Sequence, residues 1–430
     1  MNRPQTLAAW LSYLETLHPK SIALGLERVV DVYARMATTL ACPVITVTGT
    51  NGKGSTCAML ESVLRRAGYR TGLYTSPHLM RYNERVQVGG ESQDDPALVA
   101  AFNAVEDARE GVPLTYFEYG TLAAFWTFAR SALDVAILEV GLGGRLDAVN
   151  VIDADVAVVT SVDLDHMDYL GPTRDAIAYE KAGIFRSGRS VVCAEPDPPA
   201  PLTAHARAVG APITQIGRDY GFVAEQGQWQ YWGPGGRRYG LPYPALRGHF
   251  QLGNAATALA VVDHLRDRLH VGSGAIRDGL LAVELPGRFQ VLPGRPAIVL
   301  DVAHNPHAAR ALAATLSKMG FFAQTIAVFG ILADKDIRGV ITAVKARIDL
   351  WCVGTLPGPR GASAETVRKE LVGMGIDVDA IRVFSDIASA FATAQGEAGE
   401  ADRIIIFGSF LTVAAVLAEK PETRRIPRNG

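Results

Sequence analysis

The feature that most constrains the fold is a β-branched segment that ends in a glycine-rich turn and leads into an amphipathic helix. The segment is Pro43–Thr48, the turn is Gly49–Ser55, and Met59 and Val63 begin the apolar side of the helix. Small residues let the backbone approach an anion closely, and the N–H groups at the start of the helix point towards it. Lys53 adds a positive charge, so the segment predicts a phosphate-binding loop between a buried strand and a helix.

This turn departs from the usual phosphate-loop pattern G-x-x-x-x-G-K-[ST]. The first glycine of that pattern would fall at Val47, and Gly54 stands between Lys53 and the hydroxyl of Ser55. The alternative is a glycine-rich strand-to-helix turn with a surface lysine. Because strand, glycines, lysine and helix follow one another in the required order, we favour the phosphate loop.

Length and charge limit the classes of protein to which the chain can belong. At 430 residues it is too long for one hydrophobic core, so we expect two domains. Lys and Arg total 42 and Asp and Glu total 44, and the net charge of -2 gives no electrostatic reason to expect a nucleic-acid partner. The four cysteines form no C-x-x-C pair, which favours a reducing compartment over a zinc site or a disulfide framework.

No segment of the sequence is predicted to span a membrane. The longest apolar region, Leu122–Leu142, is interrupted by Arg130, Asp134 and Glu139. Glu15 and the lack of a small-residue cleavage site argue against a signal peptide at the N-terminus. We therefore expect a cytoplasmic protein.

Short β-branched segments alternate with amphipathic ones, which predicts a parallel sheet covered by helices on both faces. The predicted strands of the first part of the chain are Val44–Thr48, Gly72–Thr75, Val135–Val140, Val156–Ser161 and Ser190–Cys193. The predicted helices there are Gly54–Ala67, Tyr116–Ser131, Arg174–Phe185, Asn254–Leu269 and Ser273–Val283. Between Gly221 and Tyr243 the composition changes to Gly, Trp, Tyr and Gln, which predicts an antiparallel hairpin.

Leu285–Arg288 predicts a hinge, after which the alternation restarts. The later predicted strands are Ala297–Asp301, Thr325–Phe329, Leu350–Val353, a short one near Val383 and Arg403–Phe407. The later predicted helices are Pro306–Lys318, Asp336–Ala346, Ser363–Val372, one from Asp386 and one from Ser409. The sequence therefore predicts an α/β protein, with a P-loop-type parallel-sheet domain over residues 1–285 and a smaller, Rossmann-like doubly wound domain over residues 286–430.

Polar side chains follow several predicted strands, at the sheet edge where ligands of open parallel sheets collect. Glu139 ends one strand, and a carboxylate there, near a triphosphate, suits Mg²⁺. Ser76 follows another strand, either as a metal-facing hydroxyl or as part of a Ser-Pro turn. Gly141–Asp147 fails the dinucleotide pattern G-x-G-x-x-G because its sixth position is Leu146, which argues against nicotinamide binding.

Two further strands are followed by segments that contain histidine. His166 lies within Asp163–Asp168, either as a metal ligand or as a structural histidine, and the segment lacks the glycine and glutamate of an EF-hand loop. In the second domain Asp301–His307 contains an H-x-x-H pair, but no third zinc ligand is evident. Asn305 is predicted to cap the helix that starts at Pro306.

A series of motifs runs in order from His18–Arg28 to the last helix. They are Gly49–Thr56, Ser76–Leu79, Asn83–Val86, Tyr116–Glu118, Leu138–Asn150, Asp165–His166, Glu180–Ile184, Pro286–Phe289, Asp301–Pro306 and Gly408–Phe410. Together these motifs resemble those of the folylpolyglutamate synthases, a family of the Mur ligase superfamily whose bacterial members are also dihydrofolate synthases. No motif of that family is missing, although Gly221–Tyr243 carries no signature of it.

The resemblance implies ATP-dependent amide formation. The carboxylate of dihydropteroate or of a reduced folate attacks the γ-phosphorus of ATP and becomes an acyl phosphate, and the amine of L-glutamate then attacks its carbonyl. Lys53, the loop amides and two Mg²⁺ ions would supply positive charge around the phosphoryl oxygens. By the same resemblance, residues 1–285 hold ATP and the pterin, residues 286–430 form the glutamate-ligase domain, and the protein is a monomer.

The resemblance also assigns roles to the residues at matching positions. The ATP-binding residues would be Thr50, Asn51, Gly52, Lys53, Gly54, Ser55, Asn254, Arg288 and Asp301. The metal ligands would be Ser76, Glu139, His166 and Lys181. The catalytic residues would be Lys53, Lys181 and His304, of which His304 is, with Ser409, a candidate for binding glutamate. The remaining substrate-binding residues would be Ile22, Ala23, Leu24, Thr115, Tyr116, Phe117, Glu118, Leu146, Asp147 and Ala148.

Lys181 matches a lysine that is carbamylated by carbon dioxide in this family. Carbamylation turns a cation into an anion that can bind a second Mg²⁺, and it requires a neutral amine. The pKa of this lysine should therefore be lowered, by burial or by nearby positive charge. The alternative is an exposed helix lysine paired with Glu180 or Asp175.

Two other functions remain open from the sequence. A cell-wall ligase of the same superfamily would carry a similar phosphate loop, although Tyr116–Glu118 and Ser76–Leu79 favour a folate substrate. A nucleotide switch that recruits a partner would need no second small-molecule cleft. The release of ADP in response to glutamate and pteroate distinguishes the ligases from the switch.

Overall fold

The computed structural model describes residues 3–20, 22–248 and 250–419. The chain divides into two compact units, Met1–Ala245 with Leu252–Val283, and Leu246–Gln251 with Glu284–Gly430. Each unit has its own sheet and its own hydrophobic core. Residues 420–430 of the predicted second domain lie outside the described part of the chain.

The first unit is built on a sheet whose middle strands are all parallel. Its strands are β1 (Val44–Thr48), β2 (Thr71–Tyr74), β3 (Val86–Val88), β4 (Glu91–Ser92), β5 (Val135–Glu139), β6 (Val156–Val159), β7 (Ser190–Cys193) and β8 (Ile213–Gln215). They lie in the order β4-β3-β2-β5-β1-β6-β7-β8, with β3 and β4 antiparallel at one edge. β1, β5 and β6 are buried along their whole length, which explains their continuous apolar sequences.

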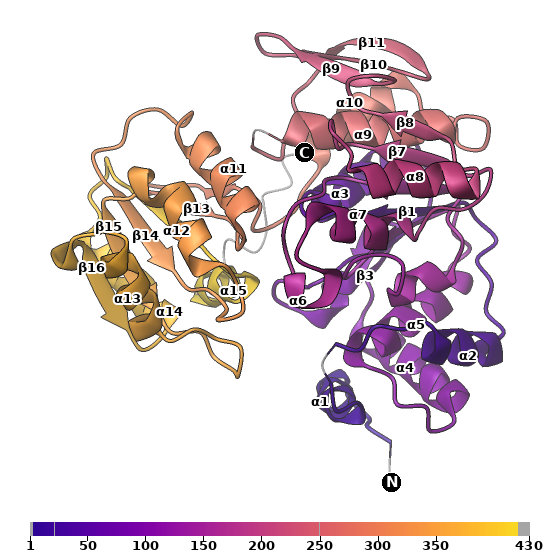
Figure 1. Ribbon diagram of the computed structural model, residues 1–430, viewed down its shortest axis with the longest axis horizontal. Coiled ribbons are helices and arrows are strands. Elements are labelled where there is room, and N and C mark those ends of the chain that lie inside the picture. The colour runs from indigo at the N-terminus through magenta and orange to yellow at the C-terminus, as the bar shows by residue number, and fades with distance from the viewer. Residues whose placement is uncertain (1–2, 21, 249, 420–430) are drawn as a thin grey trace. The chain divides into compact units, whose positions relative to one another are not determined.

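Helices cover this sheet in separate groups (Figure 1). The helices of one group pack against one another; they are α1 (Leu7–Leu17), α2 (Glu27–Met36), α4 (Asp95–Arg109) and α5 (Tyr116–Ala129). The others are α3 (Lys53–Arg66), α6 (Met167–Leu170), α7 (Arg174–Ala182), α8 (Ala200–Val209), α9 (Gln251–His264) and α10 (Ser273–Ala282). Two 3-10 helices, η1 (Tyr82–Arg85) and η2 (Ala148–Val151), follow the strands β2 and β5.

The segment predicted as a hairpin is an antiparallel sheet of three strands. They are β9 (Gly221–Ala224), β10 (Trp229–Gly233) and β11 (Gly236–Leu241). Trp229 and Tyr231 alternate on β10 and are both buried, and the Tyr231 hydroxyl donates to Asp263 of α9 at 2.5 Å. This contact ties the small sheet to α9.

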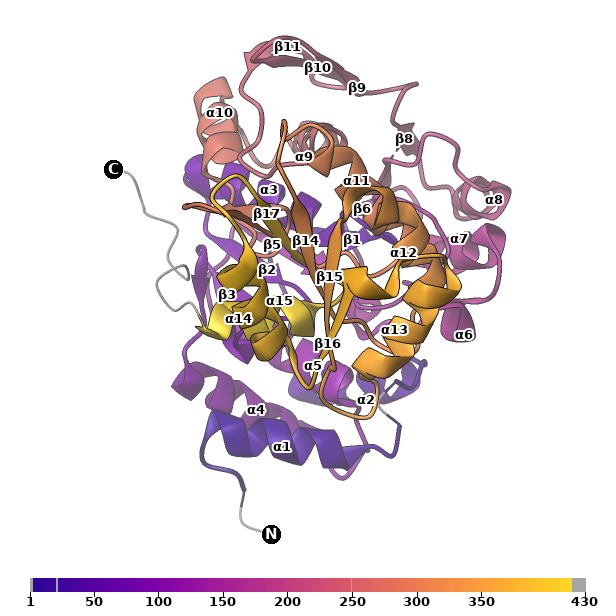
Figure 2. The same ribbon diagram turned by 90° about the vertical axis from the view of Figure 1, so that its left-hand side faces the viewer.

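The second unit is a doubly wound sheet, as the sequence predicts. Its strands are β12 (Gln290–Leu292), β13 (Ala297–Leu300), β14 (Thr325–Phe329), β15 (Leu350–Gly354), β16 (Ile381–Phe384) and β17 (Arg403–Phe407). They lie in the order β12-β13-β17-β14-β15-β16, and β12 alone among these described strands is antiparallel. The helices are α11 (Pro306–Leu316), α12 (Ile337–Val344), α13 (Ala364–Gly373), α14 (Ile387–Glu397) and α15 (Phe410–Glu419). Figure 2 shows α14 and α15 on one face of this sheet and α11, α12 and α13 on the other.

The predicted strands β1, β7, β14 and β17 keep both bounds, whereas β2, β5, β6, β13 and β15 differ from the prediction by one or two residues at an end. Several helix bounds differ as well. α7 ends at Ala182 rather than at Phe185, because Gly183 takes the C-cap position. α9 begins at Gln251, before the expected Asn254. Across the described ranges, no helix combines the length and the apolar character needed to cross a membrane.

Candidate active site

The predicted site residues of the first unit lie where adjacent parallel strands end. β2, β5, β1 and β6 are neighbours in this order and all run parallel, so the loops after them leave the same edge of the sheet. Val47 of β1 lies opposite Glu139 of β5 in the register. The edge therefore gathers Gly49–Lys53, Ser76, Glu139 and the segment that follows β6.

The glycine-rich loop has a backbone that only glycine fits at two positions. Gly49 has a φ of 151°, and a Cβ there would overlap the hydroxyl oxygen of Thr160. Gly52 has a φ of 89° and forms the N-cap of α3, and a Cβ there would lie 2.8 Å from Oδ1 of Asn254. The close approach of Asn254 places its amide against the loop, as expected for a residue of the same binding site.

The segment after β6 holds this loop in place. The backbone N–H of Thr50 donates to the Ser161 carbonyl at 2.9 Å, and that of Asn51 donates to the Ser161 hydroxyl at 3.0 Å. The Thr160 hydroxyl donates to the Asn51 carbonyl at 2.6 Å, and the Thr50 hydroxyl donates to the Asp163 carbonyl at 3.0 Å. These bonds fix the loop before any ligand binds.

Lys53 begins α3 and extends over the loop. Its Nζ donates to the Gly49 carbonyl at 3.0 Å. The N-terminal end of a helix of this length carries partial positive charge, and the lysine adds a full one. This end of α3 therefore suits the oxygens of a phosphate chain.

Glu139 and Ser76 are brought together by the neighbouring strands β5 and β2. Glu139 is 4% exposed, and its Oε2 accepts from the backbone N–H of Ser76 at 3.2 Å. His166 lies in the segment after β6, adopts a φ of 51° at the start of α6, and has a side chain that is 30% exposed. The three residues supply oxygen and nitrogen donors, and hard divalent cations favour the oxygens. Over the described ranges, no group of three or more His, Cys, Asp and Glu side chains is placed to hold a metal ion.

Lys181 is buried at the end of α7, with 3% of its surface exposed. Burial, and after it the positive charge of Lys53, lower the pKa of Lys181 to about 7, although the charges of Asp165 and Asp147 oppose the shift. The alternative of an exposed helix lysine is therefore wrong. Glu180 is instead paired with Arg145, at 2.8 Å.

Asp147, predicted to bind substrate, is a buried carboxylate in the loop after β5. It is 4% exposed and accepts from the backbone N–H groups of Leu142 at 2.8 Å and Val149 at 3.0 Å, so it caps η2. Burial raises the pKa of Asp147 to about 6, although these backbone donors and the charge of Lys53 lower it. Its neighbours Leu146 and Ala148 are half-buried and buried, respectively.

The predicted substrate residues of α5 form the first turn of that helix. Thr115 and Glu118 make a capping box, in which Glu118 Oε2 accepts from the backbone N–H of Thr115 at 2.8 Å. The Phe117 ring packs so closely on Gly141 that a Cβ there would lie 2.6 Å from it. Arg85 lies 5.4 Å from the centre of the Tyr116 ring and donates to Nδ1 of His78 at 2.9 Å.

Ile22, Ala23 and Leu24 line a cavity of about 610 Å³ between the loop that follows α1, the start of α2, and α6. Its other lining residues include His18, Lys20, Arg28, Asp168 and Tyr169. The lining does not include Thr115–Phe117 or Leu146–Ala148 within the described ranges. The predicted substrate residues thus fall into separate groups, and Arg28 connects two of them because it pairs with Glu118 at 2.7 Å.

The predicted residues of the second unit gather at the ends of β13 and β17, which are parallel neighbours. Asp301 follows β13 and accepts from the backbone N–H groups of Phe289 at 2.9 Å and Ala303 at 2.8 Å. Burial raises the pKa of Asp301, and the charge of Arg288 opposes this shift. Phe410 lies 5.4 Å from the Arg288 guanidinium.

His304 and Ser409 also lie at this edge of the second sheet. Nδ1 of His304 contacts the Val302 carbonyl at 2.8 Å; since a carbonyl only accepts, this nitrogen carries the proton. The rings of His304 and Phe410 are 6.2 Å apart. Ser409 is 5% exposed, and its hydroxyl accepts from the backbone N–H of Leu411 at 3.1 Å. Asn305 caps α11 through Ala308, as the sequence predicts.

Sequence reasoning missed the residues that hold the site residues in place. Thr160 and Ser161 were expected only as the end of a strand, and their hydroxyls bond the phosphate loop. The available signal was the pair of hydroxyl residues at the end of a predicted strand, at the sheet edge where the glycine-rich loop was also expected. Arg28 contacts Glu118 from a distant part of the sequence, and no local pattern indicates this contact. Arg85 contacts His78 within one short segment.

Comparisons with known proteins match both units. The family model of the Mur ligase middle domain matches residues 47–262, and that of the Mur ligase glutamate ligase domain matches residues 287–410. Dihydrofolate synthase/folylpolyglutamate synthase of Escherichia coli (strain K12) is 47% identical over 96% of this chain and 94% of that protein. The protein of the same name from Haemophilus influenzae is 42% identical over 95% of this chain and 96% of that protein.

Solved structures give the same result. E. coli FolC in complex with DHPP and ADP has a TM-score of 0.92 and 46% identity, covering 98% of this chain and 100% of that one. A bifunctional folylpolyglutamate synthase/dihydrofolate synthase with Mn, AMPPNP and L-glutamate bound has a TM-score of 0.89 and 45% identity. That match covers 96% of this chain and 98% of the other.

Proposed function

This chain belongs to the dihydrofolate synthase/folylpolyglutamate synthase family of Mur ligases, and from that membership we propose that it is an ATP-dependent ligase. It joins L-glutamate to dihydropteroate, and to folates that already carry glutamate. The acceptor carboxylate attacks the γ-phosphorus of ATP, the acyl phosphate forms, and the glutamate amine then displaces phosphate. A carboxylate is a poor electrophile, so this activation is what makes the amide bond accessible.

The observation that carries the proposal is the arrangement of Gly49–Lys53 at the end of β1. The loop leads into the N-terminal end of α3, which carries partial positive charge, and Lys53 lies over the loop with its amine on the Gly49 carbonyl. We propose that this lysine leaves that carbonyl for the phosphate oxygens when ATP binds. Thr50–Ser55 and Asn254 would hold the triphosphate, because a Cβ at Gly52 would reach Asn254. Arg288 and Asp301 are proposed for the same nucleotide from the second unit.

The donors at the strand ends fit a divalent cation. Ser76, Glu139 and His166 are the proposed ligands, with Lys181 completing the set once it is carbamylated, and we propose Mg²⁺ at two positions. Such an ion, when bound, neutralises charge on the phosphate oxygens. The chain contributes the buried Glu139 carboxylate, which the Ser76 amide orients at 3.2 Å.

Lys181 is proposed to carry the carbamate. Its burial and its proximity to Lys53 favour the neutral amine, which is the form that reacts with carbon dioxide. The carbamate on Lys181 would be an anion near Lys53 and near the acids Asp147 and Asp165. Its negative charge would be compensated by Lys53 and by a bound metal ion. This role accounts for a lysine that is 3% exposed without a carboxylate pair in its own helix.

The remaining residues are proposed to bind the acceptor and the amino acid. Ile22–Leu24, Thr115–Glu118 and Leu146–Ala148 would form the pterin site, and His304 and Ser409 would receive glutamate. The cavity beside Ile22–Leu24 is large enough for a bicyclic heterocycle. Location in the cytoplasm, a monomeric state and these residue roles stay predictions.

The test is a steady-state assay of ADP and phosphate release. We expect release that depends on glutamate and on dihydropteroate, and, in a second series, on a reduced folate in its place. Release with neither acceptor would contradict the proposal, and release that ignores glutamate would favour the nucleotide switch. For the cell-wall ligase alternative, competition between a pterin and a nucleotide-sugar peptide decides, and we expect the pterin to bind.

A further inference from the structure

The loop between α1 and α2 is held at both ends by consecutive residues of α5. The described residues of this loop, 18–20 and 22–26, include Ile22, Ala23 and Leu24, which line the cavity. The two residues of α5 are Glu118 and Tyr119. Glu118 contacts the loop through Arg28, and Tyr119 contacts α1 through residues of α4. The two residues together connect the loop to the first turn of α5.

The first connection runs from Glu118 to the start of α2. Glu118 is 4% exposed and pairs with the Arg28 guanidinium at 2.7 Å. The same guanidinium donates to the carbonyl of Ala23 at 3.0 Å. Arg28 therefore links the capping carboxylate of α5 directly to the backbone of the loop.

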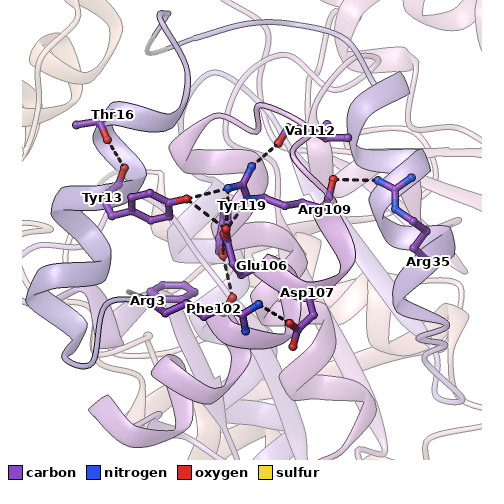
Figure 3. A network of polar contacts seen from close by, with 10 residues as sticks. All are labelled: Arg3, Tyr13, Thr16, Arg35, Phe102, Glu106, Asp107, Arg109, Val112 and Tyr119. Carbon is purple, nitrogen blue, oxygen red and sulfur yellow. Dashed lines mark hydrogen bonds and ion pairs between the residues drawn. The ribbon is translucent and has the colours of Figure 1, made fainter. Parts of the chain in front are cut away.

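The second connection runs from Tyr119 through α4 to α1 (Figure 3). The Tyr119 hydroxyl lies 3.1 Å from Oε2 of Glu106, and Arg109 donates to both oxygens of that carboxylate at 2.7 Å. Arg109 also donates to the Tyr13 hydroxyl at 2.8 Å, and this hydroxyl donates to Glu106 at 3.2 Å. Glu106 and Arg109 are three residues apart on α4, and their two-pronged pair fixes the orientation of both side chains. The hydroxyls of Tyr13 on α1 and Tyr119 on α5 meet this pair, so it connects the two helices through α4.

Apolar packing supports the same connection. Trp10, one turn before Tyr13 on α1, is fully buried, and its ring lies 5.9 Å from that of Phe102 and 6.2 Å from that of Tyr119. The end of α1 leads directly into His18, which lines the cavity. Any shift of α1 against α5 would therefore move the loop.

We propose that Tyr13, Glu106 and Arg109 are positioning residues for the acceptor site. They do not line the cavity within the described ranges, and they act by holding α1, and through it the loop, against the first turn of α5. This inference rests on the proposed function, since it concerns the folate or pteroate acceptor of that reaction. We expect changes at these residues to alter the affinity for the acceptor and not the affinity for the nucleotide. The phosphate loop is held by other residues, Thr160 and Ser161.

The test compares Tyr13→Phe with Tyr243→Phe in the full-length protein. The first variant removes the hydroxyl that receives Arg109 and keeps the ring that packs on Trp10. The second removes a hydroxyl that donates to the Glu225 carbonyl at 2.9 Å, outside the site. With Tyr13→Phe we expect KM for dihydropteroate to rise about fivefold, with kcat and KM for ATP changed less than about twofold. Tyr243→Phe should leave all three values unchanged.

A second variant and a second measurement cover the case in which Tyr13→Phe does not fold. Arg109→Lys keeps the charge and loses the two-pronged contact, and we expect the same rise in KM for the acceptor alone. Hydrogen exchange of residues 22–28 should be faster in either variant than in the wild type. An unchanged acceptor KM, an equal rise in both KM values, or unchanged exchange of this segment overturns the inference. A wild-type protein without glutamate-dependent ADP release would instead overturn the proposed function.

Discussion

The amine of Lys53 donates to the carbonyl oxygen of Gly49 at 3.0 Å. The ammonium group that is proposed to bind the phosphates of ATP therefore connects the two ends of the phosphate loop. Lys53→Ala removes this charge from the start of α3. We expect a loss of at least about a hundredfold in kcat/KM for ATP, because the lysine stabilises charge in the transition state. Lys345→Ala is the matched control, since its amine donates to the Met374 carbonyl at 3.1 Å. Substantial ligation by Lys53→Ala, with a native circular dichroism spectrum, would remove the phosphate-loop assignment.

Gly49→Ala tests the shape of the loop. A methyl group there would collide with the Thr160 hydroxyl, and the φ of 151° is unfavourable for alanine. We expect loss of nucleotide binding, measured by calorimetry with ADP, and a lower unfolding temperature. Gly272→Ala is the control, because a Cβ there meets no atom within 4 Å. Wild-type affinity for ADP in Gly49→Ala would show that the loop adapts.

Lys181 should react with carbon dioxide. Since burial lowers its pKa to about 7, much of the amine is neutral near pH 7.5, whereas an ordinary lysine is almost fully charged. We expect a carbamate signal by carbon-13 NMR with labelled bicarbonate, and its loss in Lys181→Ala together with activity. Lys369, exposed on α13, serves as the comparison and should give no such signal in Lys369→Ala difference spectra. Full activity of Lys181→Ala without any carbamate in the wild type would exclude this role.

His264 should make the stability of the protein depend on pH. Burial lowers the pKa of His264, whose Nε2 lies 2.8 Å from the Thr214 hydroxyl. The unfolded chain binds a proton near its ordinary pKa of about 6.5, while the folded chain resists it. The stabilising contribution is therefore present above that pKa and is lost as the pH falls through the lower, folded pKa.

The measurement is the unfolding temperature between pH 8 and pH 5. We expect it to fall with pH in the wild type and to fall less in His264→Gln, whose amide can still bond Thr214. His270→Gln, at an exposed position, should behave as the wild type. Equal slopes for wild type and His264→Gln would show that other groups cause the dependence.

The sequence predicts the elements whose signals are local. β1 has the predicted bounds, since a β-branched run lies between Pro43 and Gly49. α4, Asp95–Arg109, was missed. The local signals for it were present, since Asp94 caps the helix, Pro96 lies in its first turn, and its buried residues have helical spacing. β3, β4, β8 and β12 are short edge or near-edge strands, and their pairing partners rather than their sequences define them.

The candidate site was predicted as a set of residues, but its contacts were not. The burial of Lys181 depends on packing by the loop after β5, where a Cβ at Gly144 would lie 3.0 Å from the Lys181 carbonyl. The position of Lys181 in the sequence of α7 does not indicate that this loop covers it. In the same way, Glu118 was expected to touch substrate, and its pair with Arg28 joins residues that are far apart in sequence.

The cavity at Ile22–Leu24 and the loop at Gly49–Lys53 present different chemistry to a small molecule. The first is lined by side chains, which substitutions can enlarge or close, whereas the second offers mainly backbone groups and glycines that cannot be replaced. An inhibitor seated in the cavity would distinguish this enzyme from relatives with other side chains there, and resistance would arise by single substitutions in the N-terminal segment. An inhibitor of the loop would gain durability at the expense of selectivity among ATP-using ligases.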